Sequence, residues 1–261
     1  LHGADRILRA LVEEHISWES MTYLSERVGF VSASIGRMVP VVTDELKAVD
    51  PLIVGVEPFC SLPVDALAFR GGIPEIKNMV PSENIAYHTD AKLYIHNMLH
   101  SACAYLGYIK GYTYIYEAVG DGEIIKTIRG ALGEIAQAIA AEHGVSAEEP
   151  LKYGEDLLRR FANRALADSV ARVGRDTPRK LSYEDRLTGA ARLCEKHGVG
   201  YGEIAKAIAA ALCFAADEPS AEIRGFALRE GAAEALVKYA GLGRDSGILK
   251  AAVSEYQRLS I

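Results

Sequence analysis

The sequence predicts a mainly α-helical protein with a small antiparallel β element near its N-terminus. Two patterns lead to this fold class. After Pro81, helix-compatible runs with apolar residues three and four positions apart continue almost to the end of the chain. Before Pro81, short segments rich in β-branched or small residues stand between prolines, which is typical of strands. With 261 residues, of which 49% are hydrophobic and 25% charged, the chain can bury one large core.

The predicted elements follow one another along the chain. A helix is predicted over 4–27, where apolar residues recur at helical spacing and end near Gly29. Two strands are predicted over 28–40 and 52–59, bounded by prolines, and a third over 67–69. The remainder is predicted as helices over 82–108, 115–143, 147–165, 183–197, 201–214, 220–240 and 246–259.

Composition and charge narrow the classes of function. The formal net charge of -6 argues against a nucleic-acid-binding protein, which normally carries a basic face. No apolar run reaches about 18 residues, so no membrane span is predicted. Cys60, Cys103, Cys194 and Cys213 are far apart, which favours a reducing, cytoplasmic setting over a disulfide or zinc scaffold. The first residue is Leu1 and no signal-like region follows, so we expect a piece of a longer protein.

The first helix after the strands carries the first candidate site. At about 100° per residue, Lys92, His96 and His100 form one stripe, and Asn97 lies beside His100. A lysine in apolar surroundings shifts toward its neutral form, which can act as a base. The residues alone leave three interpretations open: a packed helix whose lysine reaches solvent, a metal site of His96, His100 and Cys103, and acid/base catalysis by Lys92.

A second candidate site is the basic segment that includes Arg172, Arg175, Arg179 and Lys180. A glycine and a proline within it disfavour a regular helix, so four cations are displayed on an irregular stretch. Such a stretch can hold an anionic or polyhydroxylated ligand, and it can equally be a solvated loop. Glu57, at the end of a predicted strand, is either an exposed charge or a ligand acceptor.

Four separated motifs resemble the polyol-specific long-chain dehydrogenase/reductase family, also called the mannitol dehydrogenase family. They are Arg-Met-Val-Pro at 37–40, Glu57-Pro58-Phe59, Lys92-x4-Asn97-x2-His100, and Arg172-Val-Gly-Arg-x3-Arg179-Lys180-Leu followed by Asp185-Arg186-Leu187. The motifs run in the family's order and cover its C-terminal, substrate-binding half. Two positions depart from the family pattern, because Gly36 stands where an Asp is usual and Leu99 where bacterial members tend to have Gly.

The resemblance implies a multi-helical substrate domain over 1–261, similar to the C-terminal domains of mannitol dehydrogenase and 6-phosphogluconate dehydrogenase. It also implies a metal-independent oxidoreductase that uses NAD, held by a separate N-terminal Rossmann domain that we expect to be absent from this chain. The sequence contains no Gly-x-Gly-x-x-Gly motif, and Gly120-Asp121-Gly122 is better interpreted as a turn. The implied partners are a polyol or polyol phosphate and the Rossmann domain, with neither nucleic acid nor membrane.

The resemblance also assigns roles to individual residues. Lys92 is the implied general base that takes the hydroxyl proton, and Asn97 donates a hydrogen bond to the developing alkoxide. His96 has no role in the family pattern and is expected to pack. The implied reaction interconverts a sugar alcohol, such as mannitol 1-phosphate, and a ketose, such as fructose 6-phosphate. The alternatives are mannitol 2-dehydrogenase or hexuronate reductase chemistry, and a non-catalytic helical interaction domain. The residues implied to hold the substrate's hydroxyls or phosphate are His100, Arg172, Arg179, Lys180 and Glu57.

Overall fold

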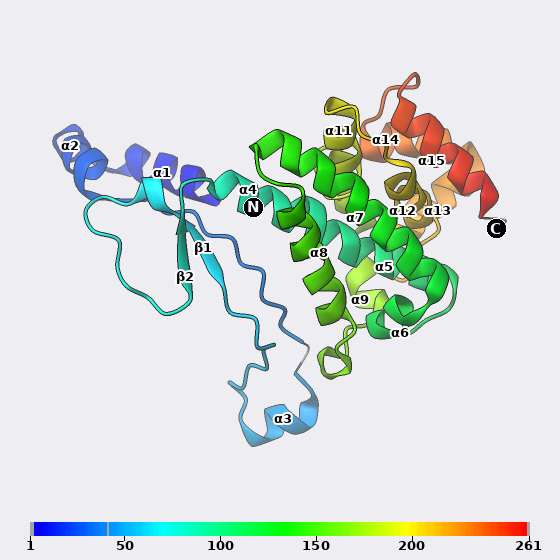
Figure 1. The fold of residues 1–261 in the computed structure, drawn as a ribbon, viewed down its shortest axis with the longest axis horizontal. Coiled ribbons are helices and arrows are strands. Elements are labelled where there is room, and N and C mark those ends of the chain that lie inside the picture. The colour runs from blue at the N-terminus through cyan, green and yellow to red at the C-terminus, as the bar shows by residue number, and fades with distance from the viewer. Residues whose placement is uncertain (1–2, 41, 260–261) are drawn as a thin grey trace. The chain divides into compact units, whose positions relative to one another are not determined.

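The computed structural model describes residues 3–40 and 42–259, which divide into two units. Unit 1 comprises residues 3–38 and 56–92, and unit 2 comprises 39–40, 42–55 and 93–259. Figure 1 labels the helices and strands of both units. Among the described residues, no helix is long and apolar enough to cross a membrane.

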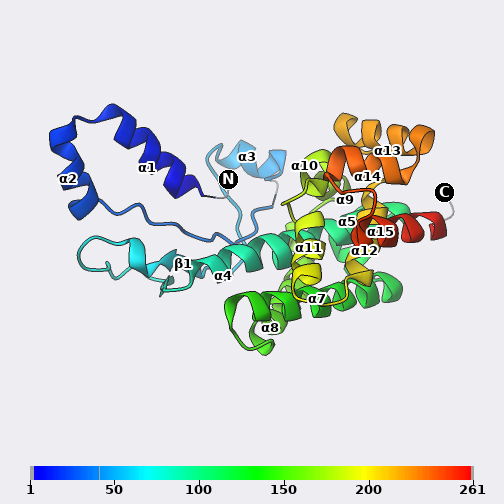
Figure 2. The ribbon, with the colours of Figure 1, turned by 90° about the horizontal axis from the view of Figure 1, so that it is seen from above.

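Unit 1 begins with two helices where the sequence predicted one. The helix predicted over 4–27 is interrupted because Ile16 is extended, with φ −104° and ψ 157°. Figure 2 shows the chain turning between the two helices. The elements of this unit are α1 (Ala4–His15), α2 (Trp18–Arg27), β1 (Leu62–Asp65), the 3₁₀ turn η1 (Ala66–Ala68), β2 (Met79–Ser82) and α4 (Ile85–Asp90).

The β element is parallel, so the predicted antiparallel pairing is wrong. β1 pairs with β2 from Leu62 opposite Met79 to Asp65 opposite Ser82. The connection from 66 to 78 is 13 residues long, as the bounds of the two strands show. That is about the length that a crossover between parallel strands needs, whereas an antiparallel pair can close with a two-residue turn.

The segments that were predicted as strands form no ladder. Among the described residues of the two longer segments, the one bridge joins Ala33 to Val64. The backbone N–H of Ser34 donates to the carbonyl of Pro63 at 2.9 Å. A proline has no N–H with which to return the bond, so the ladder stops there. The third segment, 67–69, overlaps the 3₁₀ turn η1 instead of forming a strand.

Unit 2 is helical and contains most of the buried core. A π-helical segment, η2 (Ala91–Asn97), joins α4 to the first long helix of this unit, and its residues 93–97 belong to unit 2. The other elements are α3 (Asp44–Val49), α5 (Met98–Ile109), α6 (Ile115–Gly120), α7 (Gly122–His143), α8 (Glu148–Phe161), the 3₁₀ turn η3 (Arg164–Leu166), α9 (Val170–Gly174), α10 (Thr177–Leu181), α11 (Thr188–Lys196), α12 (Gly202–Ala211), α13 (Glu218–Glu230), α14 (Ala232–Ala240) and α15 (Gly247–Arg258).

Two more of the predicted helices, both in unit 2, are interrupted. The prediction over 115–143 is divided where the carboxylate of Asp121 accepts two backbone hydrogen bonds, at 2.9 and 3.0 Å, and so begins α7. The prediction over 220–240 is divided at Gly231, whose φ of 95° lies outside the helical region. The segment predicted to be irregular around the basic residues is instead two short helices, α9 and α10.

The core of unit 2 forms around α5. α7, α9 and α12 pack against this helix, and α15 packs on α12 (Figures 1 and 2). Tyr105 on α5, Ile135 on α7 and Phe214 after α12 are fully buried. A Cβ on Gly174 would lie 2.4 Å from atoms of the Phe214 ring, so only a glycine lets α9 come this close. This packing fixes the start of the basic segment beside α5.

Candidate functional site

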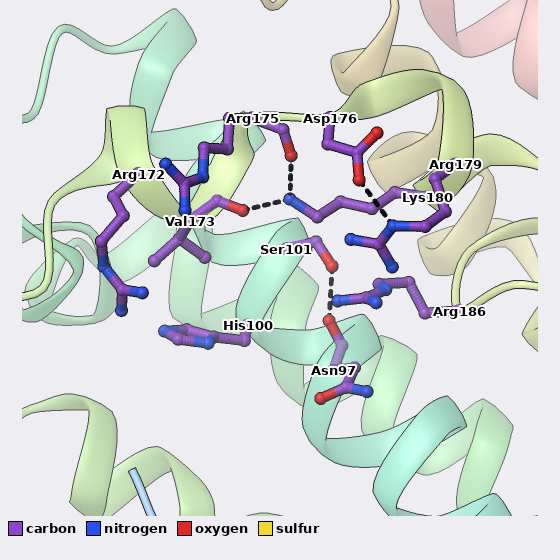
Figure 3. A pocket seen from close by; sticks show the side chains of 10 residues that line it. All are labelled: Asn97, His100, Ser101, Arg172, Val173, Arg175, Asp176, Arg179, Lys180 and Arg186. Carbon is purple, nitrogen blue, oxygen red and sulfur yellow. Dashed lines mark hydrogen bonds and ion pairs between the residues drawn. The ribbon is translucent and has the colours of Figure 1, made fainter. Parts of the chain in front are cut away.

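One cavity in unit 2 gathers side chains from both candidate sites of the sequence. Its volume is about 310 Å³. In Figure 3, η2 and α5 form its lower wall and the stretch from α9 to α10 forms its upper wall. Five of the predicted site residues are therefore brought together. The lining residues are Asn97, His100, Ser101, Arg172, Val173, Arg175, Asp176, Arg179, Lys180 and Arg186.

The wall of this cavity is strongly cationic. Among the described residues that line it, Asp176 is the one carboxylate, against four arginines and Lys180. Charged donors make the shortest and strongest hydrogen bonds to anionic oxygens. Walls of one sign also raise the local concentration of an oppositely charged ligand. The cavity therefore suits a ligand that carries a phosphate or carboxylate group.

The carboxylate of Asp168 joins His100 to Arg172. His100 Nε2 lies 3.1 Å from Asp168 Oδ2, and Arg172 Nε donates to Asp168 Oδ1 at 2.7 Å. Burial raises the pKa of Asp168, but its hydrogen bonds and ion pairs with His100 and Arg172 outweigh burial and hold the pKa below its ordinary value. The imidazole of His100 also stacks on Phe161, with ring centroids 4.6 Å apart. These contacts hold His100 in one orientation at the cavity wall.

Two further arginines are oriented by carboxylates. Arg179 Nε donates to Asp176 Oδ2 at 2.5 Å, and Arg179 Nη1 donates to Asp185 Oδ2 at 3.4 Å. Asp185 Oδ1 accepts a hydrogen bond from Arg186 Nε at 2.7 Å. A planar guanidinium that is held on one edge presents its remaining donors in a fixed direction. Arg179 and Arg186 are thus set at the wall by the protein itself.

Lys180 is nearly buried, with 5% of its surface exposed. Its ammonium group donates to the carbonyl of Val173 at 2.5 Å and to the carbonyl of Arg175 (Figure 3). Burial, together with the neighbouring Arg186 and Arg179, lowers the pKa of Lys180 to about 7. Lys180 therefore holds the end of α9 and also supplies the cavity with a cation that titrates near neutral pH.

The helix that leads to the cavity has an irregular centre. Between α4 and α5, the segment η2 is π-helical, a form in which backbone hydrogen bonds join residues five apart. The prediction that Lys92, His96 and His100 lie on one stripe was based on the α-helical rotation of about 100° per residue. A π-helix turns by a different angle per residue, so this stripe is interrupted within η2. π-Helical turns inside α-helices are rare and occur frequently at functional sites.

His96 packs in the interior, which confirms the expectation for it. Only 2% of its surface is exposed, its ring centroid lies 5.8 Å from that of Phe161, and its Nδ1 lies 3.5 Å from the hydroxyl of Tyr153. Cys103 is fully buried, and burial raises the pKa of its thiol to about 12. Across residues 3–40 and 42–259, no three His, Cys, Asp or Glu side chains gather in a metal-binding arrangement.

Two predicted site residues, Glu57 and Lys92, belong to unit 1. Glu57 is buried, and its carboxylate accepts a hydrogen bond from the backbone N–H of Met38 at 2.6 Å. Its backbone carbonyl accepts another from Arg37 Nε at 2.9 Å. Glu57 is therefore not the exposed strand-end charge that one interpretation of the sequence offered. Its role in binding and the catalytic role of Lys92 stay predictions.

Sequence reasoning missed Asp168 and Arg186 as candidate site residues, whereas Arg175 was already part of the basic candidate segment. Arg186 stood in the last of the quoted motifs, but its spacing alone did not point to the cavity. Asp168 stands four residues before Arg172, and this is the spacing at which an acid and a base pair on a helix. That spacing is the signal that could have found it.

Two family models match the chain. Residues 84–256 match the model described as the mannitol dehydrogenase C-terminal domain. Residues 2–78, which the sequence reasoning assigned to the substrate domain, match the model described as the mannitol dehydrogenase Rossmann domain. The two matches meet between residues 78 and 84, close to the start of α4.

Curated relatives named mannitol-1-phosphate 5-dehydrogenase are similar over most of the chain. The protein from Caldanaerobacter subterraneus subsp. tengcongensis is 32% identical over 258 residues, which are 98% of this chain and 66% of that relative. The protein from Brevibacillus brevis is 36% identical over 212 residues, which are 81% of this chain and 54% of that relative. The chain thus spans between about half and two thirds of the length of these relatives.

Two solved structures share the fold. Mannitol 2-dehydrogenase from Pseudomonas fluorescens, in a ternary complex with NAD and D-mannitol, has a TM-score of 0.75 at 19% identity and covers 98% of this chain and 56% of its own. A D-sorbitol dehydrogenase in substrate-free form has a TM-score of 0.78 at 18% identity and covers 100% of this chain and 59% of its own. At these identities the two structures support the fold and not the substrate.

Proposed function

The chain belongs to the mannitol dehydrogenase family, and from this premise we propose that it forms the substrate-binding and general-base part of an NAD-dependent polyol dehydrogenase. The proposed reaction interconverts a sugar-alcohol phosphate, such as mannitol 1-phosphate, and a ketose phosphate, such as fructose 6-phosphate. The observation that carries the proposal is the cavity of unit 2, where four arginines and Lys180 face Asn97 and His100.

The charge of the cavity supports a phosphorylated substrate over a free polyol. A phosphate monoester carries a charge of about −1.5 to −2 near pH 7 and three strong acceptor oxygens. Guanidinium groups match its oxygens in bidentate pairs, and the wall offers Arg172, Arg175, Arg179 and Arg186. A neutral polyol gains much less from so many cations. The volume of about 310 Å³ also lies within the usual range for small-molecule sites.

The chain's own side chains supply the proton chemistry of this proposal. As a neutral amine, Lys92 takes the proton from the reacting hydroxyl group. Asn97 donates a hydrogen bond to the same oxygen as it gains negative charge, and His100 and the arginines hold other oxygens of the substrate. Lys92 and Asn97 both belong to η2 and stand five residues apart, the separation that backbone hydrogen bonds join in a π-helix.

NAD is the proposed hydride acceptor, but the residues present do not form a turn that would hold its pyrophosphate. The sequence has no Gly-x-Gly-x-x-Gly motif. Gly120-Asp121-Gly122 has two of the glycines of this motif, but it joins the helix α6 to the helix α7, whereas a dinucleotide-binding turn joins a strand to a helix. The part proposed for these residues is therefore to bind the substrate and to move its proton.

Unit 1 exposes apolar side chains that suit a partner domain. α1 has no buried residue, and Ile7, Leu8 and Leu11 on it are about half exposed. Trp18, at the start of α2, is 81% exposed. Apolar side chains that stand exposed along one helix are typical of a place where another protein surface packs. Because residues 2–78 themselves match a Rossmann-domain model, we propose that further dinucleotide-binding structure packs against these side chains.

The test is NADH oxidation by the full-length gene product, with fructose 6-phosphate, fructose, tagaturonate and fructuronate as separate substrates and a chelator present. Turnover of fructose 6-phosphate well above that of fructose is the expected result. A preference for fructose would favour mannitol 2-dehydrogenase activity, and a preference for either uronate would favour hexuronate reductase activity. Silence with all four substrates would overturn the proposed reaction and favour a non-catalytic interaction domain.

A further inference from the structure

We propose that Asp168 is a positioning residue of this site: its carboxylate keeps the His100 imidazole protonated and in one orientation at the cavity wall. Asp168 is not among the residues that line the cavity, so it acts through His100. The consequence for substrate binding rests on the proposed function. The pairing of His100 with Asp168 does not depend on the proposed function, because it is given by the distance of 3.1 Å between His100 Nε2 and Asp168 Oδ2.

The backbone fixes the point from which the Asp168 carboxylate extends. Ser169, the next residue, forms an isolated antiparallel bridge with Tyr114. In the same contact, the N–H of Ile115 donates to the carbonyl of Asp168 at 2.9 Å. The hydroxyl of Ser169 then caps α9 by accepting from the N–H of Arg172 at 3.2 Å. Asp168 is therefore held on a rigid support between a bridge and a helix start.

The imidazole of His100 is held on its edge and on its face. Its edge meets Asp168, which is only 8% exposed, so solvent ions screen the pair weakly. Its face lies on Phe161, with an interplanar angle of 14° and centroids 4.6 Å apart. A protonated ring stacked on an aromatic face gains cation–π attraction. Both contacts favour the charged, oriented form of the ring.

The other charges around His100 oppose its protonation. Each neighbouring cation disfavours a further positive charge on the ring. Asp176, the carboxylate of the cavity, is already paired with Arg179. Asp168 supplies the negative charge that offsets the cations, and it pairs with Arg172 at the same time. The groups that face His100 or share its cavity are Arg172, Arg175, Arg179, Lys180, Arg186 and, on the same helix with ring centroids 6.2 Å apart, His96.

The chain contains a second pair of the same kind, which serves as a matched control. Glu142 Oε2 lies 2.6 Å from His197 Nε2 and accepts a hydrogen bond from Lys196 at 2.6 Å. A carboxylate again joins a histidine to a cation, but neither residue lines the cavity. Glu142 is 27% exposed, against 8% for Asp168. The same acid-to-amide substitution can be made at both positions. Comparing the two variants distinguishes the effect of removing any such carboxylate from the effect of removing the one beside the cavity.

The experiment compares D168N and E142Q in the full chain. Both amides keep an oxygen that can accept a hydrogen bond from the imidazole, and both remove the negative charge. Titration of the histidines by NMR should show that D168N lowers the pKa of His100, whereas E142Q leaves the pKa of His100 unchanged. In the full-length enzyme at pH 7, D168N should raise KM for fructose 6-phosphate about tenfold or more, while E142Q leaves KM unchanged.

The outcomes separate this proposal from the proposed function. An unchanged titration of His100 in D168N overturns the positioning role, whatever the activity. A lowered pKa of His100 in a protein that turns over no ketose supports the positioning role and overturns the proposed reaction. If D168N does not fold, the wild-type titration decides: His100 must be protonated at pH 7, and a neutral His100 at that pH overturns the proposal.

Discussion

The ammonium nitrogen of Lys180 lies 2.5 Å from the carbonyl oxygen of Val173, so a residue of α10 holds the end of α9. A cation is favoured beside the unsatisfied carbonyls at a helix C-terminus. Burial acts in the opposite direction, because it disfavours the charged form. Lys180 thus makes a structural contact and also places a titratable charge at the cavity wall. The first role affects the free energy of unfolding, and the second affects the affinity for anions.

Sulfate binding to the cavity should weaken as the pH rises through about 7. The pKa of Lys180 is lowered to about 7, so the side chain is charged below this pH and neutral above it. Sulfate keeps its charge over this range, whereas a phosphate monoester titrates near pH 6. Calorimetric titrations at pH 6 and pH 9 should differ in affinity by about tenfold. K180M should reduce this difference, because position 180 then no longer titrates, and K250M, at an exposed lysine, should keep it in full. Equal wild-type affinities at the two pH values would contradict the prediction.

The stability of the fold should also depend on the protonation of Lys180. Its pKa is about 7 in the folded protein and near its ordinary value of 10.5 when unfolded. The unfolded state therefore binds more protons between about pH 7 and 10.5, and the contribution of Lys180 to the free energy of unfolding rises with pH across this window. Below this window both states are protonated and the cost of burial is fully present. Urea unfolding at pH 7 and pH 9.5 should show a smaller rise for K180M than for the wild type.

The close approach of Gly174 to Phe214 predicts that G174A is destabilising. A Cβ at this position would lie 2.4 Å from two atoms of the ring, and overpacking of this kind costs about 1–3 kcal/mol. G133A, in the interior of α7, is the matched control because its Cβ would meet nothing within 4 Å. We expect G133A to be neutral or stabilising by about 0.4–1 kcal/mol. Equal urea midpoints for the two variants would show that α9 can move away from the ring.

The sequence predicted the long helices and many of the side chains that line the cavity. It predicted less well which strands pair and which distant side chains contact one another. Helical periodicity is local, so the runs that became α5, α7 and α12 are visible in the residues themselves. The parallel pair is not, because β1 and β2 are only four residues long and pair across 13 intervening residues. The ion pair between His100 and Asp168 joins residues far apart in the sequence, and no spacing rule predicts such a contact.

Arg179 should contribute more to a phosphorylated substrate than to a free polyol. It lines the cavity, and two carboxylates hold its guanidinium group there. R179A should raise KM for fructose 6-phosphate at least about tenfold and change KM for fructose within about twofold. R159A, at an exposed arginine that pairs with Asp156 at 3.0 Å, should change neither. Equal effects of R179A on both substrates would make Arg179 a polyol contact or a structural support.

The general-base role of Lys92 predicts a loss of turnover without a loss of folding. K92A in the full-length enzyme should lower kcat about 10²–10⁴-fold, because proton removal by a positioned base contributes a factor of this size. K92R should be impaired to a similar degree, since a guanidinium keeps the charge but does not release its proton near neutral pH. Circular dichroism and Tm close to wild type, together with full activity of K250A, are the controls. Wild-type turnover by K92R would show that position 92 contributes a charge and not a base.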